Sequence, residues 1–130
     1  MKLDMDCVRD VLLEVEAKSG FCRFVSFPSG FDQDIRNRYS DDALRYHIDQ
    51  CFSSGLLVAL DPVHPWDMAM NTTIKDLSPA GHEFLSNIRQ DSLWNKTKSV
   101  AASVGSFSIR ALADIAASVV SAAVQAHLNS

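Results

Sequence analysis

Apolar residues recur at helical spacing from the first residues of the chain onward. Residues 4–18 form one apolar stripe through Met5, Val8, Val11, Leu12 and Val15. Asp4 stands just before the stripe, where a side chain can cap a helix, so the pattern predicts a first helix. The Phe-rich run over residues 22–27 ends in Pro-Ser-Gly and predicts a short strand. Residues 31–39 carry apolar side chains at every fourth position, which favours a short helix.

Residues 41–54 show the most complete helical pattern, because both helix ends are encoded. Ser40 is a good N-cap, and the first turn holds Asp41 and Asp42, where the helix dipole favours negative charge. Gly55 suits the left-handed position that follows a helix. The inner face is predicted to hold Leu44, Ile48, Cys51 and Phe52.

The remaining pattern completes the expected fold. "LLVAL" and "MAMNTTIKDL" read as two strands joined by "DPVHPWD", and helices are expected from Pro79, over 92–104 and over about 107–128. The predicted order of elements is that of a winged-helix domain: helix, strand, short helix, helix, hairpin and helix. We therefore predict an α+β, mostly α fold. It has a winged helix-turn-helix core in residues 1–90 and a helical extension in 91–130 that packs on the core or dimerises, within one compact unit.

The last predicted helix is long and rich in Ala and Val, which raises the question of a membrane span. Polar side chains, Asp114 among them, share one of its sides, so the pattern favours an amphipathic soluble helix. Its apolar stripe can pack on the chain's own helix 92–104 or on a second copy, and the sequence leaves both open. The predicted homodimer interface consists of Ile109, Leu112, Ile115, Ala116, Val119 and Ala123.

Net charge, cysteine content and the N-terminal sequence limit the classes of function and the cellular location to be expected. The chain has 130 residues, a net charge of −4 and a pI of about 5.4, and nucleic-acid binders are usually basic at least locally. Three widely spaced cysteines fit a reducing compartment better than a disulfide framework. The charged start "MKLDMDC" lacks the apolar core of a signal peptide. We expect a cytoplasmic protein.

The outer face of helix 41–54 is the main candidate site. A reader of the DNA major groove normally presents Arg, Lys, Asn or Gln there, whereas this face is acidic and aromatic. One alternative is that this face only contacts solvent and has no binding function. The functional interpretation is a protein-binding surface, completed by the predicted hairpin tip, with the residues Asp42, Arg45, Tyr46, Asp49, His64 and Trp66. The alternative is a DNA-binding regulator that contacts phosphates through Arg36, Arg38 and Arg45.

Motifs for catalysis or metal binding are weak. His47 and Cys51 stand four residues apart on one helix, a spacing that can hold a metal, but a core cysteine beside a histidine is the favoured interpretation. His64 and Asp67 could orient a base, yet no motif ties a nucleophile to them. The sequence has no Gly-rich phosphate loop and no His-Glu-x-x-His. We expect no enzymatic activity, no cofactor and no metal.

Four segments resemble a known family: "MKLDMDCVRDVLLEVE", "YHIDQCFSSGLL", "LSPAGHEFLSNIRQDSLWNKTK" and "GSFSIRALADIA". The family comprises uncharacterised bacterial and prophage proteins and is catalogued as a domain of unknown function. The resemblance implies a winged-helix-like fold and frequent carriage on mobile elements, and it brings no catalytic residues. A modulator of host or defence machinery is the expected role.

Overall fold

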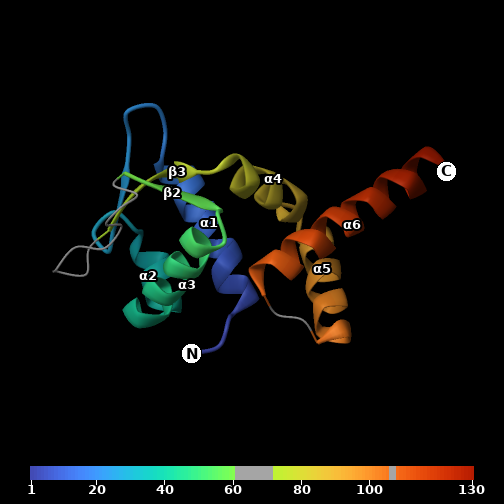
Figure 1. The fold of residues 1–130 in the computed structure, drawn as a ribbon, viewed down its shortest axis with the longest axis horizontal. Coiled ribbons are helices and arrows are strands. Elements are labelled where there is room, and N and C mark those ends of the chain that lie inside the picture. Colours follow the sequence, from blue (N-terminus) through green and yellow to red (C-terminus); the bar gives the residue numbers. More distant parts are fainter. Residues whose placement is uncertain (61–71, 106–107) are drawn as a thin grey trace. The chain divides into compact units, whose positions relative to one another are not determined.

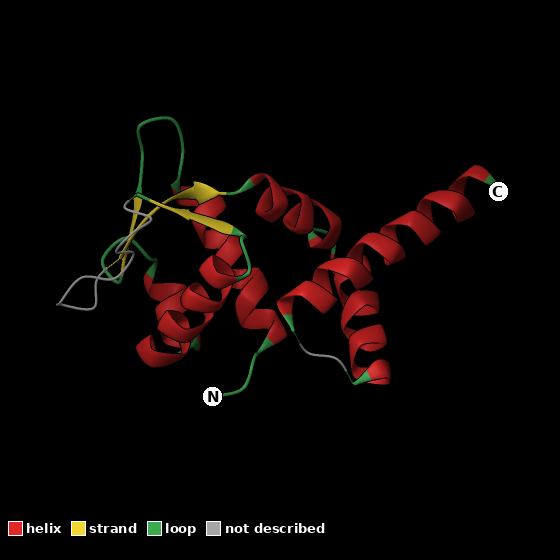
Figure 2. Ribbon diagram, in the orientation of Figure 1, coloured by secondary structure: helices red, strands yellow, loops and turns green. Residues whose placement is uncertain are grey.

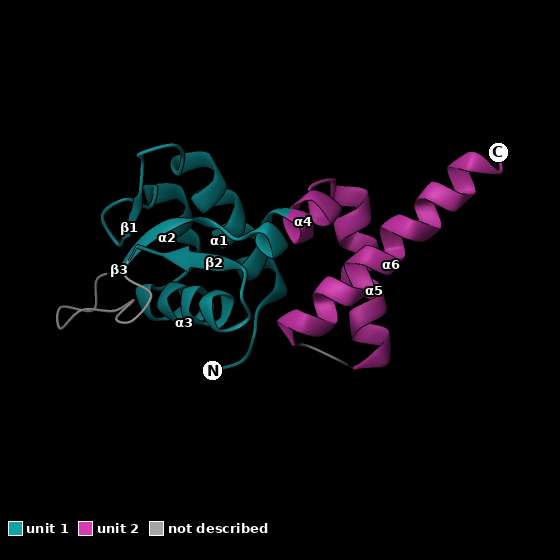
Figure 3. Ribbon diagram, turned by 45° about the horizontal axis from the view of Figure 1, so that its top comes forward, with its two compact units in different colours: residues 1–82 teal, residues 83–130 magenta. Residues whose placement is uncertain are grey.

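The computed structural model describes residues 1–60, 72–105 and 108–130. Within them the fold is α+β and mostly helical, with six helices and one three-stranded antiparallel sheet (Figure 1) (Figure 2). Two compact units divide the chain, residues 1–82 and residues 83–130 (Figure 3). The sequence pattern placed the boundary between the core and the helical extension after residue 90. The division at 82 assigns most of the fourth helix to the second unit.

The predicted elements are present in the predicted order. Their bounds are α1 Met5–Lys18, β1 Val25–Phe27, α2 Gln33–Arg38, α3 Asp41–Ser53, β2 Leu57–Ala59, β3 Thr72–Leu77, α4 Pro79–Ile88, α5 Asp91–Val104 and α6 Ile109–Leu128. The start of the second predicted hairpin strand and its tip, with His64, Trp66 and Asp67, lie outside the described residues.

The first predicted strand is shorter than expected, because its first residues form a turn. Gly20 and Arg23 pair with each other through two backbone hydrogen bonds of 3.1 and 2.9 Å. Cys22, at the tip of this turn, has a left-handed φ of 61° that an extended strand does not contain. Only Val25–Phe27 then pair with β3.

The sheet has the order β1-β3-β2, so β3 is its central strand. Val25 lies opposite Ile74 and Leu57 opposite Leu77, and a bulge interrupts β2 between Val58 and Ala59. Side chains alternate between the two faces of a strand. The inner face and the helices α1 and α3 together bury an apolar core that includes Val8, Val11, Leu12, Val15, Val25, Phe27, Leu44, Ile48, Leu57, Ala59 and Ile74.

Helix α3 has the ends that its sequence encodes. The Ser40 hydroxyl accepts the Ala43 N–H at 3.1 Å. At the other end Gly55 has φ 76° and its N–H donates to Phe52, while the Leu56 N–H donates to Cys51 at 2.9 Å. This pair of bonds is the Schellman motif, which satisfies the last helical carbonyls. Both predicted caps are confirmed.

Helix α4 starts in close contact with the end of α3. The Ser78 N–H donates to the Leu56 carbonyl at 2.9 Å. One turn later Gly81 lies so near that a Cβ atom at this position would be 2.1 Å from the same Leu56 oxygen. Only glycine permits this approach.

The second unit contains a helical hairpin. Helix α5 ends at Gly105, which has a left-handed φ of 69°, and α6 begins after the Ser108 N-cap. Trp94 and Ala101 of α5 are buried, as are Ile109, Leu112 and Ala116 of α6. The two helices pack on each other. From residue 121 onward every residue of α6 is exposed.

Candidate interaction surfaces

His47 is a structural residue, because both of its ring nitrogens are used inside the first unit. Nε2 accepts the backbone N–H of Asp4 at 2.8 Å, and Nδ1 lies 2.7 Å from the Ala43 carbonyl, to which it donates. The side chain is 1% exposed. The sequence placed His47 beside the core as a possible partner of Cys51 in a metal site. In this arrangement no lone pair of the ring is free to bind a metal.

The buried thiols are unsuited to nucleophilic chemistry. Burial, and then the negative charges of Asp4 and Asp10, raise the pKa of the Cys7 thiol to about 12. Burial also raises the pKa of Cys51, with Cys7 as a second cause. The thiolate is the reactive form of cysteine, so both side chains remain protonated, inert members of the core. Among the described residues there is no group of three potential metal ligands.

The outer face of α3 lies at the surface, as the sequence indicated. Asp42 and Asp49 are exposed, whereas Arg45 and Tyr46 are half-buried. The Arg45 guanidinium lies over the Phe27 ring at 5.7 Å, and the Tyr46 ring meets His47 edge-on at 5.1 Å. Contacts within the unit therefore hold the cation and the aromatic ring of this face in place. The other two predicted members, His64 and Trp66, lie outside the described residues.

Each arginine proposed to contact phosphates is paired with a carboxylate of its own unit. Arg36 lies 3.4 Å from Asp41 and Arg38 lies 2.8 Å from Asp10. Arg45 lies 3.9 Å from Asp42. A phosphate would have to compete with these carboxylates for each guanidinium. The three arginines are thus each in an ion pair, of which Arg38–Asp10 is the shortest and Arg45–Asp42 the longest.

A second surface, which the sequence did not reveal, is the solvent-facing side of the sheet. We call it the outer sheet face and define it by Phe21, Phe24, Val58 and Leu60. Phe21 is 98% exposed on the turn before β1, and Phe24 and Leu60 are 47% and 49% exposed. Alternation places Phe24 on the side of β1 opposite to the buried Val25. The sequence predicted a short strand over residues 22–27. In the structure Phe21 lies on the turn at residues 20–23, and alternation separates the exposed Phe24 from the buried Val25 and Phe27.

A hollow of about 420 Å³ adjoins the outer sheet face. It lies between the 20–23 turn and β3, and its walls are Gly20, Phe21, Cys22, Phe24, Lys75 and Asp76. Aromatic side chains, the amine of Lys75 and the carboxylate of Asp76 surround it, so it offers apolar contact together with a donor and an acceptor. Such a combination suits a protruding side chain of a protein partner.

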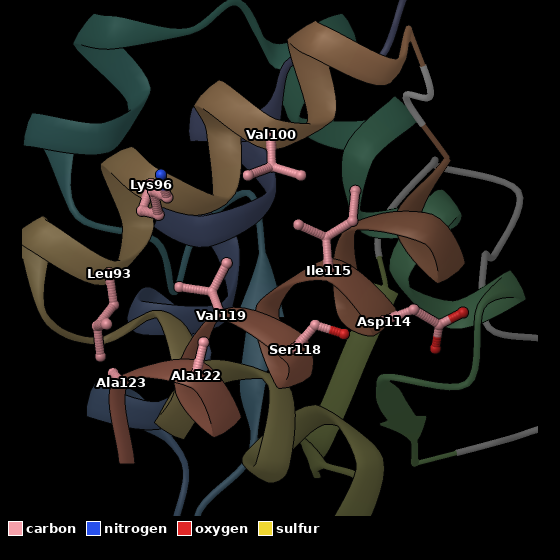
Figure 4. A pocket seen from close by; sticks show the side chains of 9 residues that line it. All are labelled: Leu93, Lys96, Val100, Asp114, Ile115, Ser118, Val119, Ala122 and Ala123. Carbon is pink, nitrogen blue, oxygen red and sulfur yellow. The ribbon is translucent and has the colours of Figure 1, made fainter. Parts of the chain in front are cut away.

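A third surface lies between the two helices of the second unit. The α5–α6 groove has a volume of about 660 Å³ (Figure 4). It is lined by Leu93, Lys96, Val100, Asp114, Ile115, Ser118, Val119, Ala122 and Ala123. The predicted dimer stripe is therefore divided. Ile109, Leu112 and Ala116 are buried within the chain, whereas Ile115, Val119 and Ala123 line the open groove.

Among the described helices, α6 also has the length and apolar composition to cross a membrane. The mean hydropathy of its most apolar window is 1.4, and 11% of that window is buried. Length and composition alone are weak evidence for a span, since Arg110 and Asp114 lie within the helix. What this finding does establish is that most of α6 is left uncovered by the chain.

The described residues thus define a small α+β protein whose most conspicuous features are exposed apolar surfaces. The chain belongs to the family described as hypothetical protein DUF2513, whose model matches residues 2–108. An uncharacterized protein of Haemophilus influenzae is 30% identical over 122 residues, which cover 93% of this chain and 97% of that protein. No solved structure matches the chain. The resemblance to an uncharacterised family is confirmed.

Proposed function

We propose that the first unit is a winged-helix domain. The order α1, β1, α2, α3, β2, β3 supports the proposal, because in such domains a strand hairpin follows the third helix. The antiparallel pairing of β2 with β3, the strands on either side of residues 61–71, is that of a hairpin. In this interpretation α3 occupies the position of the recognition helix.

We further propose that this domain is non-catalytic and binds a protein partner. The outer sheet face carries the proposal, because it groups exposed apolar side chains and includes Phe21, which is 98% exposed in the free chain. Aromatic side chains are enriched among the residues that dominate protein interfaces. The hollow beside Phe21 supplies polar contacts through Lys75 and Asp76. The α3 face of Asp42, Tyr46 and Asp49 is a separate candidate surface. Action on host or defence machinery stays a prediction from the sequence resemblance.

The DNA-binding alternative has less support. Its three arginines are paired with Asp41, Asp10 and Asp42, so they would enter a complex with phosphates only by exchanging partners. Strong DNA binders make roughly 6–10 phosphate contacts, a number that three arginines reach only if a dimer doubles them.

An affinity capture from the native host tests the proposal. The bait is the full chain, used with and without nuclease, beside the double variant Phe21→Ser/Leu60→Ser. We expect one or more proteins to be retained by the wild type, to resist nuclease and to be lost with the double variant. Because Phe21 and Leu60 are exposed, their replacement leaves the core intact.

The matched control is Val104→Ser, which changes an apolar side chain that is 64% exposed in the other unit. It is expected to retain the same proteins as the wild type. Loss of all captured proteins on nuclease treatment, together with equal capture by the double variant, would favour the DNA-binding alternative instead.

A further inference from the structure

We propose that the α5–α6 groove packs against the same groove of a second copy, so that two helical hairpins form a four-helix bundle and the protein is a homodimer. The inference concerns residues 83–130 and does not depend on which partner the first unit binds. It predicts a particular interface, centred on Val119 and Ala122. The predicted stripe residues Ile109, Leu112 and Ala116 are buried and do not line the groove, so they are not part of this interface.

The lining of the groove has the pattern of a bundle interface. Leu93, Lys96 and Val100 recur three and four residues apart on α5, and Ile115, Val119 and Ala122 do the same on α6. This spacing presents one side of each helix to a neighbour. Figure 4 shows these side chains from both helices directed into one space. The two alanines, Ala122 and Ala123, permit close approach of a second backbone.

Helix α6 needs a partner beyond its own chain. Isolated helices are marginal in water, and helices in proteins are stabilised mainly by packing of an apolar face. Only 11% of the apolar window of α6 is buried, and all of residues 121–130 are exposed. A groove-to-groove dimer covers Val119, Ala122 and Ala123 in both copies at once, because a twofold axis repeats each contact.

The charges of the groove complement those of a second copy. Lys96 lies toward the Leu93 end, and Asp114 lies at the end near Val100 and Ile115 (Figure 4). A twofold axis across the groove exchanges its two ends. Lys96 of one copy therefore comes to the same end as Asp114 of the other, and two opposite-charge pairs form at the rim. An uncharged or singly charged partner helix would leave one of these groups without a counterpart.

A membrane fits the groove less well than a helix does. Lipid covers a convex helix face, whereas this groove is concave between two helices and carries Lys96, Asp114 and Ser118. Charged groups within a bilayer are costly to insert. A second copy instead provides apolar side chains for the floor and opposite charges for the rim.

Sedimentation analysis of the full chain, from about 1 µM to about 100 µM, tests the association. We expect a dimer whose fraction rises with concentration. The key variant is Ala122→Asp, which places a charge in the groove at an exposed position and is expected to weaken dimerisation at least tenfold. Its matched control is Ala117→Asp, the same change at an exposed residue five positions away, on another side of α6. This control variant is expected to dimerise as the wild type does.

A charge exchange tests the pairing itself. Lys96→Glu and Asp114→Lys should each weaken self-association a few-fold, since each brings like charges together. A mixture of the two variants should restore it, because Glu at 96 then meets Lys at 114 across the interface. This rescue in a mixture requires contact between copies, which a contact within one chain cannot mimic.

Three results would overturn the proposal. One is a monomer at every concentration. Another is equal dimerisation of the Ala122→Asp and Ala117→Asp variants while both remain helical by circular dichroism. The third is a monomer that floats with phosphatidylcholine/phosphatidylglycerol vesicles and loses this binding on Ala117→Asp, which would make α6 a membrane-binding helix. None of these results bears on the outer sheet face, so failure here leaves the proposed protein-binding function standing.

Discussion

A single buried histidine links two helices of the first unit. Through its two ring nitrogens His47 joins the backbone N–H of Asp4, the residue that caps α1, to the Ala43 carbonyl inside α3. Its partner Asp4 is 43 residues away in the chain. The helical spacing of His47 and Cys51 indicated that both lie near the core, but a partner so distant in sequence could not be predicted from that spacing.

Replacement of His47 by alanine is expected to destabilise the fold by about 2–4 kcal/mol, since it creates a small cavity and leaves a buried N–H without its acceptor. Urea unfolding followed by circular dichroism measures this. The control is His82→Ala, because His82 is half exposed and lies 3.5 Å from Asp76. That change should cost within about 0.5 kcal/mol. Equal effects of the two variants would show that the His47 bonds contribute little.

The elements were predictable wherever local chemistry sets their ends. Ser40 and Gly55 define α3 because a hydroxyl cap and a left-handed glycine act within one turn of the helix. The start of β1 was not predictable in the same way. Phe21 and Phe24 have the same strand propensity as Phe27. What shortens the strand is the turn at residues 20–23, in which Gly20 pairs with Arg23, so that only Val25–Phe27 pair with β3. The outer sheet face was missed for this reason.

The contact between α3 and α4 predicts that replacing a helical glycine by alanine lowers the stability of the fold, where such a change normally raises it. A glycine in a helix is normally replaced by alanine with a gain of roughly 0.5–1 kcal/mol. At Gly81 the added Cβ would meet the Leu56 carbonyl at 2.1 Å. We therefore expect Gly81→Ala to destabilise the first unit by about 1–3 kcal/mol as overpacking.

Thermal melting of the Gly81→Ala variant shows whether stability falls or rises. The control is Ala80→Gly, the reverse change at the exposed neighbouring position. The control should lose about 0.5–1 kcal/mol through helix propensity alone. A Gly81→Ala protein that melts above the wild type would mean that α4 does not approach Leu56 so closely.

At the scale of the whole molecule, charge is unevenly distributed. Residues 1–82 contain 8 Lys and Arg against 13 Asp and Glu, a net charge of −5, while residues 83–130 contain 4 against 3, a net charge of +1. The unit that would hold a DNA-recognition helix is therefore the acidic one. Long-range repulsion opposes its approach to a polyanion before any contact is made.

Binding to random duplex DNA is accordingly expected to be weak. At about 0.15 M salt the dissociation constant should exceed roughly 0.1 mM, the weak end of non-specific DNA binding. Fluorescence anisotropy with a labelled duplex at this salt concentration and at about 0.05 M measures it. A micromolar constant that weakens steeply with salt, and that Arg38→Ala weakens further, would make DNA binding the primary function.

The distribution of the three thiols has a practical consequence for finding the partner. Cys7 and Cys51 are buried, while Cys22 is exposed at the tip of the turn, among the walls of the hollow beside the outer sheet face. A maleimide carrying a photoactivated crosslinker should therefore label the unmodified protein at one position. The sequence thus supplies its own attachment point for a probe, in the wall of the hollow beside the surface whose occupant is sought.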